Sequence, residues 1–382
     1  MQAAEAVSAR DDDRRMLAES VDDFARRATE VPRVRKWRGV EPGFDRGLWR
    51  EIAGMGWTGL LVPERCGGMA LGLGEMAEVC RGLARVLTPE PVLTCAVLAA
   101  RVLVHSQDEK LASELLAGIA SGDLIAALAW QEQAGDFGSN ACATSAALAG
   151  AQVTLNGRKR FVAGAAGADG FIVAARGDGG DVLVWVPANA SGLKVTLEPV
   201  VDGRFAAVIE LGDVRLPEAN VIARGEIARG ALDRAIDEAT AMASAELLGV
   251  MNRALEMTLD YIKTRVQFNR PIGSFQVLQH RSVDLYIQEQ LSTVVLKDAV
   301  DALDERPNET ATAAAVSRAK ARCSDAASLI TRQAIQMHGG IGFTEDADVG
   351  LYVKRALILA SSLGNSAYHR RRFLQLAPAE SE

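Results

Sequence analysis

The stretch that decides the fold runs from Tyr261 to His280 and reads Tyr-Ile-Lys-Thr-Arg-Val-Gln-Phe-Asn-Arg-Pro-Ile-Gly-Ser-Phe-Gln-Val-Leu-Gln-His. Apolar residues recur at helical spacing on both sides of it, which predicts one long helix before the stretch and another after it. Pro271 and Gly273 interrupt this periodicity, and Ser274 is a residue type that can cap the second helix. The stretch therefore predicts a break between two long helices.

Arg265, Gln267 and Phe268 lie at the end of the first predicted helix. There a cation, an amide and an aromatic ring are expected to project from the protein surface together. A guanidinium fork suits the oxygens of a phosphate or pyrophosphate. The alternative interpretation is a helix end with a favourably placed arginine and a core phenylalanine. Spacing alone leaves both interpretations open.

A second motif, Gln336-Met-His-Gly-Gly-Ile-Gly-Phe343, follows downstream. Together with Arg265–Phe268, Pro271–Gln276 and Gln279-His280, it resembles the signature of the flavin-dependent acyl-CoA dehydrogenases, and weaker similarity covers nearly the whole chain. The resemblance implies FAD as the cofactor. It also implies that this chain holds the adenosine-pyrophosphate half of an FAD bound mainly to a neighbouring subunit, through Arg265, Gln267, Phe268, Phe275, Gln276, Gln336, Gly339 and Gly340.

Composition limits the classes of protein to which the chain can belong. Its 382 residues are 49% hydrophobic, enough for a large core and two or three domains. A net charge of −7 argues against nucleic acid as the main partner. The five scattered cysteines and four isolated histidines show no zinc spacing and fit a reducing cytoplasm, and no apolar run reaches membrane-spanning length.

Periodicity divides the chain into three predicted domains: helices over 1–123, a β domain over 124–224, and a helical bundle over 225–382. In the β domain, Val153, Leu155 and Phe161 are expected on one face of a strand. Asn156-Gly157 and Gly177–Gly180 are turn signals. The prediction is an α+β fold with a small antiparallel barrel or sandwich between helical domains, which is the domain order of the acyl-CoA dehydrogenase fold.

The stretch Gly72-Leu-Gly74-Glu-Met-Ala77 fits the dinucleotide fingerprint Gly-x-Gly-x-x-Ala by spacing alone. That fingerprint binds a nucleotide only where a strand precedes it and a helix follows. No clear strand, turn and helix frame it here, so we reject a dinucleotide site at this position.

The family resemblance implies α,β-desaturation of an acyl-CoA thioester, in which a carboxylate removes the α-proton. The position usual for this base falls on Leu363, and the alternative position on the helix before Arg265 falls on Ala239. Leucine and alanine cannot accept a proton, so the catalytic base is unassigned. Glu238 and Glu246 are weak candidates, because one residue is about 100° around a helix and because Glu246 sits among leucines.

The segments that the resemblance places against the flavin ring are also altered. Trp130-Gln131-Glu132 stands where the family usually has Thr-Glu, and Phe161-Val162-Ala163 where it usually has Trp-Ile-Thr. Two hydroxyl donors to the flavin are therefore missing. Gln131 can replace one of them, whereas Ala163 offers only its backbone N–H.

These matches and losses favour a subunit that lends half of a flavin site to a paralogous, base-bearing subunit. The resemblance extends to actinobacterial heterotetramers that act on steroid-CoA side chains, and it implies an electron-transfer flavoprotein as acceptor. The alternatives are a self-sufficient homotetramer with a displaced base, a flavin monooxygenase of the same fold, and a non-catalytic scaffold without flavin.

Overall fold

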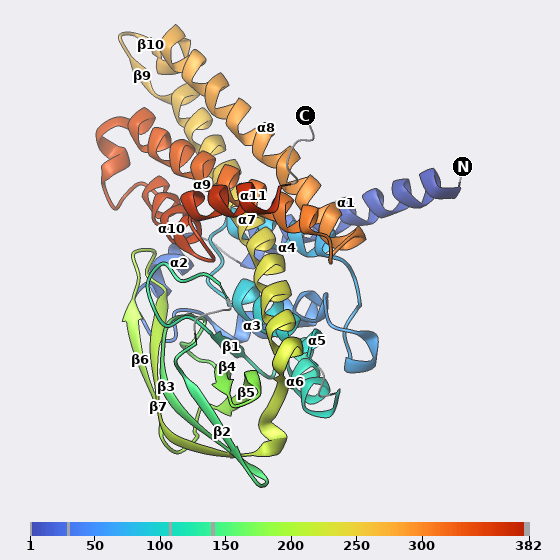
Figure 1. The fold of residues 1–382 in the computed structure, drawn as a ribbon. Helices are drawn as coiled ribbons and strands as arrows, with labels where there is room; N and C mark the ends of the chain where they lie inside the picture. The colour runs from blue at the N-terminus through green and yellow to red at the C-terminus, as the bar shows by residue number, and fades with distance from the viewer. Residues whose placement is uncertain (1, 29–30, 107–108, 139–141, 378–382) are drawn as a thin grey trace. The chain divides into compact units, whose positions relative to one another are not determined.

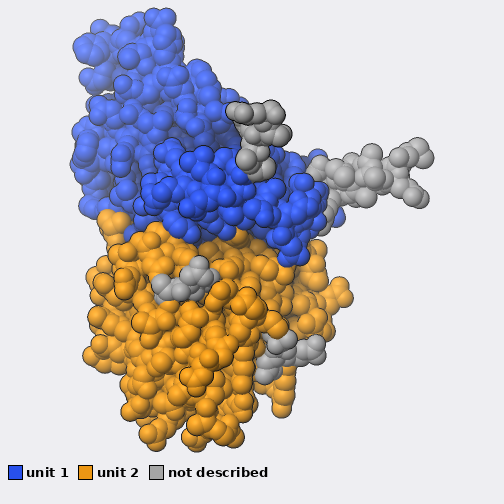
Figure 2. All heavy atoms as spheres, in the orientation of Figure 1, with its two compact units in different colours: residues 1–35, 73–88, 240–382 blue, residues 36–72, 89–239 orange. Residues whose placement is uncertain are grey.

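The computed structural model describes residues 2–28, 31–106, 109–138 and 142–377. The chain forms two compact units, which Figure 2 distinguishes by colour. Unit 1 comprises Met1–Arg35, Leu73–Thr88 and Thr240–Glu382, and unit 2 comprises Lys36–Gly72 and Pro89–Ala239. The boundaries expected from sequence at 123 and 224 stay a prediction.

The N-terminal third of the chain is helical, as expected (Figure 1). A buried π-helix over Val92–Ala99 leads directly into α5. The α-helices are α1 (Gln2–Ala28), α2 (Val31–Trp37), α3 (Arg46–Gly54), α4 (Leu73–Arg85), α5 (Ala100–Val104) and α6 (Glu109–Ser121). Within the described residues no strand stands directly before α4, so the strand that a dinucleotide fingerprint requires does not precede Gly72–Ala77.

Unit 2 contains one eight-stranded sheet, in the order β6-β7-β3-β2-β4-β5-β8, with β1 also paired to β4. Most pairings are antiparallel, but β1 and β2 each run parallel to β4. One face of the sheet encloses a core that includes Val153, Leu155, Phe171, Val184 and Ile209. The strands are β1 (Ala126–Ala129), β2 (Ser145–Ala149), β3 (Gln152–Ala163), β4 (Gly170–Gly177), β5 (Gly180–Pro187), β6 (Leu193–Pro199), β7 (Phe205–Pro217) and β8 (Val221–Arg224).

Two local expectations for β3 are wrong. Asn156-Gly157 is no turn: both residues lie inside the strand at a register shift against β7, and a Cβ on Gly157 would lie 2.6 Å from Thr144 Oγ1. Phe161 does not share a face with Val153 and Leu155, because a second register shift follows Lys159 and gives Phe161 a φ of +56°. Bulges of this kind change which face a side chain occupies.

Helices return after β8. They are α7 (Gly225–Thr264), α8 (Gln276–Glu305), α9 (Thr310–His338), α10 (Val349–Ser361) and α11 (Ser366–Leu376). The alanine-rich α9 packs against α8, α10 and α11, since small side chains permit close approach. The order of helices, central sheet and helical bundle confirms the predicted fold class. No helix within the described ranges is both long and apolar enough to span a membrane.

Gly74 lies against the side chain of Arg14. A Cβ at Gly74 would lie 1.9 Å from the guanidinium of Arg14, which bonds Glu75 at 2.8 Å. Asp304 accepts hydrogen bonds from the backbone N–H groups of Leu73 and Gly74 at 2.8 and 3.1 Å. It therefore satisfies two N–H groups at the start of α4 that have no acceptor within the helix.

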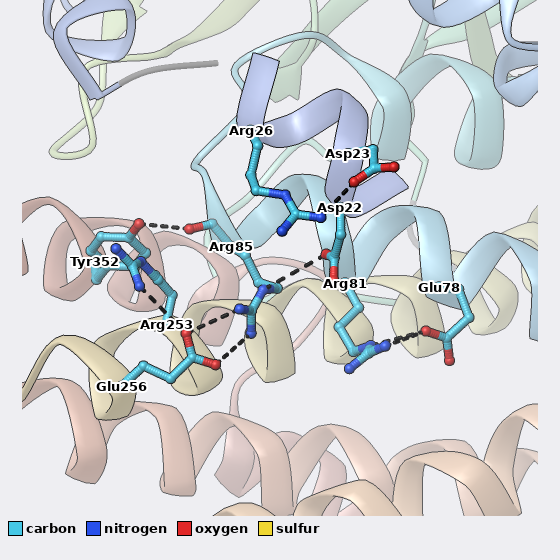
Figure 3. Close-up of polar contacts among 9 residues, drawn as sticks. All are labelled: Asp22, Asp23, Arg26, Glu78, Arg81, Arg85, Arg253, Glu256 and Tyr352. Atoms are coloured by element: carbon cyan, nitrogen blue, oxygen red, sulfur yellow. Dashed lines mark hydrogen bonds and ion pairs between the residues drawn. The ribbon is translucent and has the colours of Figure 1, made fainter. Parts of the chain in front are cut away.

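Arg85 connects several elements of unit 1 (Figure 3). Its guanidinium bonds both oxygens of Glu256 on α7, at 2.9 and 3.0 Å, and faces Asp22 on α1 at 3.9 Å. Its backbone carbonyl accepts the hydroxyl of Tyr352 on α10 at 2.6 Å. One α4 residue thus fixes three other helices of this unit.

Helices α4 and α7 approach closely at Gly249, where an added Cβ would lie 2.1 Å from the carbonyl oxygen of Arg81. Gly249→Ala is expected to destabilise the protein by about 1–3 kcal/mol, because backbone cannot yield as a side chain can. Urea unfolding followed by circular dichroism measures the change. Gly230→Ala in the same helix is the control, since its Cβ meets nothing within 4 Å. It is expected to stabilise by up to about 1 kcal/mol, and equal behaviour of the two variants would contradict the packing argument.

Candidate functional site

The break after α7 is a tight β-hairpin, which the sequence did not indicate. β9 (Val266–Gln267) pairs with β10 (Arg270–Pro271), and Phe268 and Asn269 form its two-residue turn with φ of +52° and +61°. Two consecutive positive φ values are the mark of a type I′ turn. The break itself was predicted, but Ser274 does not cap α8: its hydroxyl bonds the Pro271 carbonyl at 2.7 Å, and Phe275 occupies the N-cap position without a side-chain bond.

The hairpin presents an aromatic group together with a cation. The Phe268 ring stands edge-on to Phe275 with centroids 6.0 Å apart, and the Arg270 guanidinium lies 4.1 Å from the centroid of the Phe275 ring. Phe268 is 85% exposed, so the interpretation of this residue as core is wrong. Phe275 has one face of its ring covered by Arg270, an arrangement that favours a fixed side-chain position.

A stacking contact brings the two sequence motifs together. Tyr261, near the end of α7, stacks on His338 at the end of α9, with centroids 4.4 Å apart and 22° between the ring planes. After His338, Gly339 adopts φ +70° and ψ −145° and ends the helix, as predicted. The stack places the hairpin of the first motif beside the double glycine of the second.

This end of unit 1 leaves polar groups free for a ligand. The side chains of Arg265, Gln267, Gln276 and Gln336 are exposed and hydrogen-bond to no other residue within the described ranges. A Cβ at Gly339 or Gly340 would meet nothing within 4 Å, so there is open space above this backbone. A guanidinium, three amides and open backbone can together hold an anionic, hydrogen-bonding ligand such as a pyrophosphate.

The four residues predicted at the flavin ring lie in unit 2. Trp130 is buried and follows β1, and the amide nitrogen of Gln131 donates one hydrogen bond to the Asp136 carbonyl at 2.8 Å, which fixes the orientation of this side chain. Phe161 is 38% exposed, with the Arg160 guanidinium 4.8 Å from its ring centroid. Ala163 ends β3 and is exposed. The backbone links two of these segments, because Arg160 donates to the carbonyl of Gln131 at 2.8 Å.

Beside this segment lies a buried cluster that sequence reasoning missed. Lys159, fully buried, donates to Glu132 at 2.6 Å and to the Trp130 carbonyl at 3.3 Å, and its Nζ lies 3.1 Å from Cys142 Sγ. Burial alone would raise the pKa of Glu132, but hydrogen bonds from Lys159, Thr144 and two backbone N–H groups lower that pKa to about 2. Glu132 and Lys159 are 27 positions apart, and no motif relates them.

Glu238 is held by an arginine in unit 2. Arg101, on α5, bonds both of its oxygens, at 2.5 and 2.9 Å, and His105 Nε2 lies 3.0 Å from Oε1. Burial opposes ionisation, but these bonds prevail and lower the pKa of Glu238 to about 2. A carboxylate with so low a pKa is a poor proton acceptor at neutral pH, which disfavours Glu238 as the base.

Glu246 is similarly engaged in unit 1. It forms a buried ion pair with Arg355 of α10. A carboxylate held by a buried arginine serves the packing of the helices it joins. Ala239, the other position considered for a base, is fully buried.

Leu363 lies in the turn between α10 and α11, at φ +55°. Lys320, fully buried on α9, donates to the Gly364 carbonyl at 2.9 Å, and His369 Nε2 donates to the Leu363 carbonyl at 2.9 Å. Burial lowers the pKa of Lys320 to about 7 and that of His369 to about 3. Backbone oxygens thus fix this turn, whose four residues Ser362–Asn365 include no acid.

Glu238→Gln tests the structural role of this carboxylate. We expect a loss of about 3–5 kcal/mol at neutral pH, because the partly buried guanidinium of Arg101 would lose its counter-charge. The folded pKa of about 2 lies below the ordinary 4.5. The stabilisation is therefore present above about pH 4.5 and disappears as the pH falls toward 2.

Urea unfolding of both proteins at pH 7 and pH 3 measures this difference. Glu226→Gln, an exposed change on the same helix, is the control and is expected to stay within about 0.5 kcal/mol of the wild type. A pH-independent difference between Glu238→Gln and the wild type would contradict the assigned pKa.

Comparison with known proteins identifies two family models in the chain. "Acyl-CoA dehydrogenase, N-terminal domain" matches residues 11–123, and "Acyl-CoA dehydrogenase, C-terminal domain" matches residues 229–375. The acyl-CoA dehydrogenase IpdE2 of Mycolicibacterium smegmatis is 30% identical over 94% of this chain and 97% of its own length. FadE27 of Mycobacterium tuberculosis is 29% identical over 87% of this chain and 88% of its own length.

Two solved complexes contain chains of similar structure. A chain of the ChsE4–ChsE5 complex from Mycobacterium tuberculosis aligns at TM-score 0.86 with 28% identity, covering 96% of this chain and 98% of its own. A chain of the Tcur3481–Tcur3483 steroid ACAD, in a variant form, aligns at TM-score 0.86 with 27% identity, covering 96% of this chain and 97% of its own.

Proposed function

Because the chain belongs to the acyl-CoA dehydrogenase family, whose members are FAD-binding flavoproteins that oxidise acyl-CoA, we propose that it is one subunit of an enzyme built from two unlike subunits. In this proposal the chain shares a flavin site with a paralogous subunit, and the paralogue carries the catalytic glutamate. The reaction is α,β-desaturation of an acyl-CoA thioester, with an electron-transfer flavoprotein as acceptor.

The observation that carries the proposal is the state of the carboxylates on this chain. Leu363 occupies the turn where the family usually places the base, and this turn holds no acid. Glu238 and Glu246, the two weak candidates, are each paired with an arginine. An α-proton acceptor must be able to exchange a proton near neutral pH, so the displaced-base alternative loses support.

The adenosine side of the flavin site is the part we assign to this chain. Arg265 is proposed to bind the pyrophosphate through its fork, with Gln267, Gln276 and Gln336 as hydrogen-bonding partners. Phe268 and Phe275 would lie against the adenosine or ribose, and the open backbone at Gly339 and Gly340 would admit the phosphates closely. The free polar groups and open glycines fit such a ligand, which argues against a scaffold that has lost flavin.

The ring side of the site is less complete. Bound flavin would accept the β-hydrogen of the substrate as hydride. On this chain Trp130, Gln131, Phe161 and Ala163 would face the ring, but Gln131 has its amide nitrogen engaged by Asp136 and Ala163 offers no hydroxyl. This chain offers few hydrogen bonds to the ring but, among its described residues, several unpaired polar side chains for the adenosine half. That combination suits a subunit that completes a partner's site.

A partner subunit also accounts for the surface of α8. This helix exposes an apolar stripe with helical spacing, formed by Val277, Val283, Tyr286, Ile287, Leu291 and Val294. Contiguous exposed apolar surface marks an interaction site. The ChsE4–ChsE5 complex is an assembly of two different proteins, and its likeness to this chain supports a paralogous partner of the same fold.

The steroid ACAD among the similar structures supports a bulky, steroid side-chain CoA as substrate. We place the enzyme in a reducing cytoplasm, because Cys66, Cys80, Cys95, Cys142 and Cys323 are all free thiols in the structure.

Visible absorbance of the purified protein tests the shared site. We expect little bound flavin in the chain expressed alone. Flavin and acyl-CoA dehydrogenase activity are expected after co-expression with its nearest same-family genomic neighbour, since each half-site is then completed. A single chain that desaturates acyl-CoA at ordinary rates would refute the proposal.

Arg265→Ala tests the adenosine contact in the co-expressed complex. The complex is expected to assemble but to lose flavin affinity at least about tenfold, because a charge-assisted contact to pyrophosphate contributes about 1.5–3 kcal/mol. Flavin retention during dialysis measures the change. Lys263→Ala, an exposed cation removed near the same end of α7, is the control and should retain flavin. Equal retention by both variants would contradict the role of Arg265.

A further inference from the structure

We propose that Cys142 and Lys159 are a peroxide-sensitive pair that joins through a sulfur–nitrogen bond. The proposal concerns the sheet unit and goes beyond the proposed dehydrogenase function. It rests on the distance between the two reactive atoms and on the surroundings of each.

The distance is the first argument. Cys142 Sγ lies 3.1 Å from Lys159 Nζ, and both atoms contact Glu132 Oε1, at 3.3 and 2.6 Å. Cys142 Sγ is also within 3.3 Å of the Ala174 carbonyl oxygen. The thiol is therefore held against the amine, and no residue stands between them.

Access to solvent is the second argument. Cys142 is partly exposed, whereas Cys66, Cys80, Cys95 and Cys323 are buried. Lys159 Nζ is fully enclosed. Cys142 is therefore the most accessible cysteine of the described chain, and Lys159 is the enclosed member of the pair.

The chemistry balances with hydrogen peroxide as the only co-reactant. Peroxide oxidises the thiol by two electrons: its O–O bond breaks, an S–O bond forms, and water leaves, which gives a sulfenic acid. Lys159, which Glu132 holds at 2.6 Å, passes one proton to the sulfenic hydroxyl, and the nitrogen lone pair that this frees attacks the sulfur. The S–O bond breaks and the hydroxyl leaves as water. The nitrogen, now bonded to sulfur and positively charged, loses a second proton to solvent. The product is a sulfenamide, and a thiol reductant reverses it.

The thiol is not activated at rest. Burial raises the pKa of Cys142, although the charge of Lys159 opposes this shift. The pair should therefore respond to excess peroxide and tolerate low concentrations, because the thiolate is the form that reacts.

The bond would alter the chain beside two of the predicted flavin contacts. Lys159 is two residues before Phe161, and Glu132 follows Gln131 directly. Joining Cys142 to Lys159 removes the lysine charge and leaves Glu132 with Thr144 and the backbone N–H groups of Ala143 and Thr144. The loop after β1 would then be covalently tied to β3.

Mass spectrometry of the full chain, as purified with or without its co-purified partner, tests the proposal. After excess hydrogen peroxide, we expect the chain to be about 2 Da lighter than its reduced form, as a sulfenamide requires. Blocking of free thiols should then add one blocking group fewer than in the reduced chain. After trypsin digestion, the peptide with Cys142 should be joined to the fragment with Lys159. Dithiothreitol should restore the free thiol.

Two variants serve as controls. Cys142→Ser should lose the 2 Da change while the four buried thiols behave as before. Lys159→Arg keeps the charge without a nucleophilic amine, so Cys142 should proceed to sulfinic acid, a gain of about 32 Da. If that buried variant fails to fold, the wild-type peptide map still decides. Sulfinic acid at Cys142 with Lys159 unmodified in the wild type, or a Cys142 thiol unchanged by peroxide, would overturn the proposal.

Discussion

Two buried carboxylates on α7 are each held by an arginine from another helix, and the packing of α7 depends on these pairs. Glu238 meets Arg101 in unit 2, and Glu246 meets Arg355 in unit 1. A buried carboxylate without a counter-charge costs several kcal/mol, so each pair permits a helix of 40 residues to carry acids inside the protein. For Glu238 the pairing also lowers the pKa to about 2. At these two positions the helix therefore uses its acids for packing.

Much of this architecture can be predicted from sequence because it follows from periodicity. Local sequence signals predict the ends of α8 and α9, the hairpin at Gly177–Gly180 and the helix stop at Gly339. The hairpin at Phe268-Asn269 was missed because its turn lacks the glycine usual at positive φ, and asparagine supplies only one of the two tolerant positions. Asn156-Gly157 misled for the opposite reason, since a common turn signal serves a bulge inside β3.

The candidate site shows a similar division. Its motif residues could be found by resemblance, and the Tyr261–His338 stack shows that two motifs far apart in sequence meet at one end of unit 1. The ion-pair partners of the buried carboxylates could not be predicted, because a burial pattern in the sequence does not specify which opposite charge lies across the core. Glu238 and Arg101 are 137 positions apart, and Arg355 is 109 positions from Glu246. Whether a carboxylate is a base or a structural group depends on such a partner.

The exposed stripe on α8 has a consequence for how the protein is made. One side of the helix carries the exposed apolar side chains of Val283, Ile287, Leu291 and Val294. Contact between these side chains and water is unfavourable. If the proposed paralogous subunit covers this side, a chain released from the ribosome without that subunit leaves the stripe open to other apolar surfaces. Balanced production of the two subunits, for instance from adjacent genes on one transcript, would limit that interval. The ratio of the two messages would then matter as much to the yield of soluble enzyme as the stability of either fold.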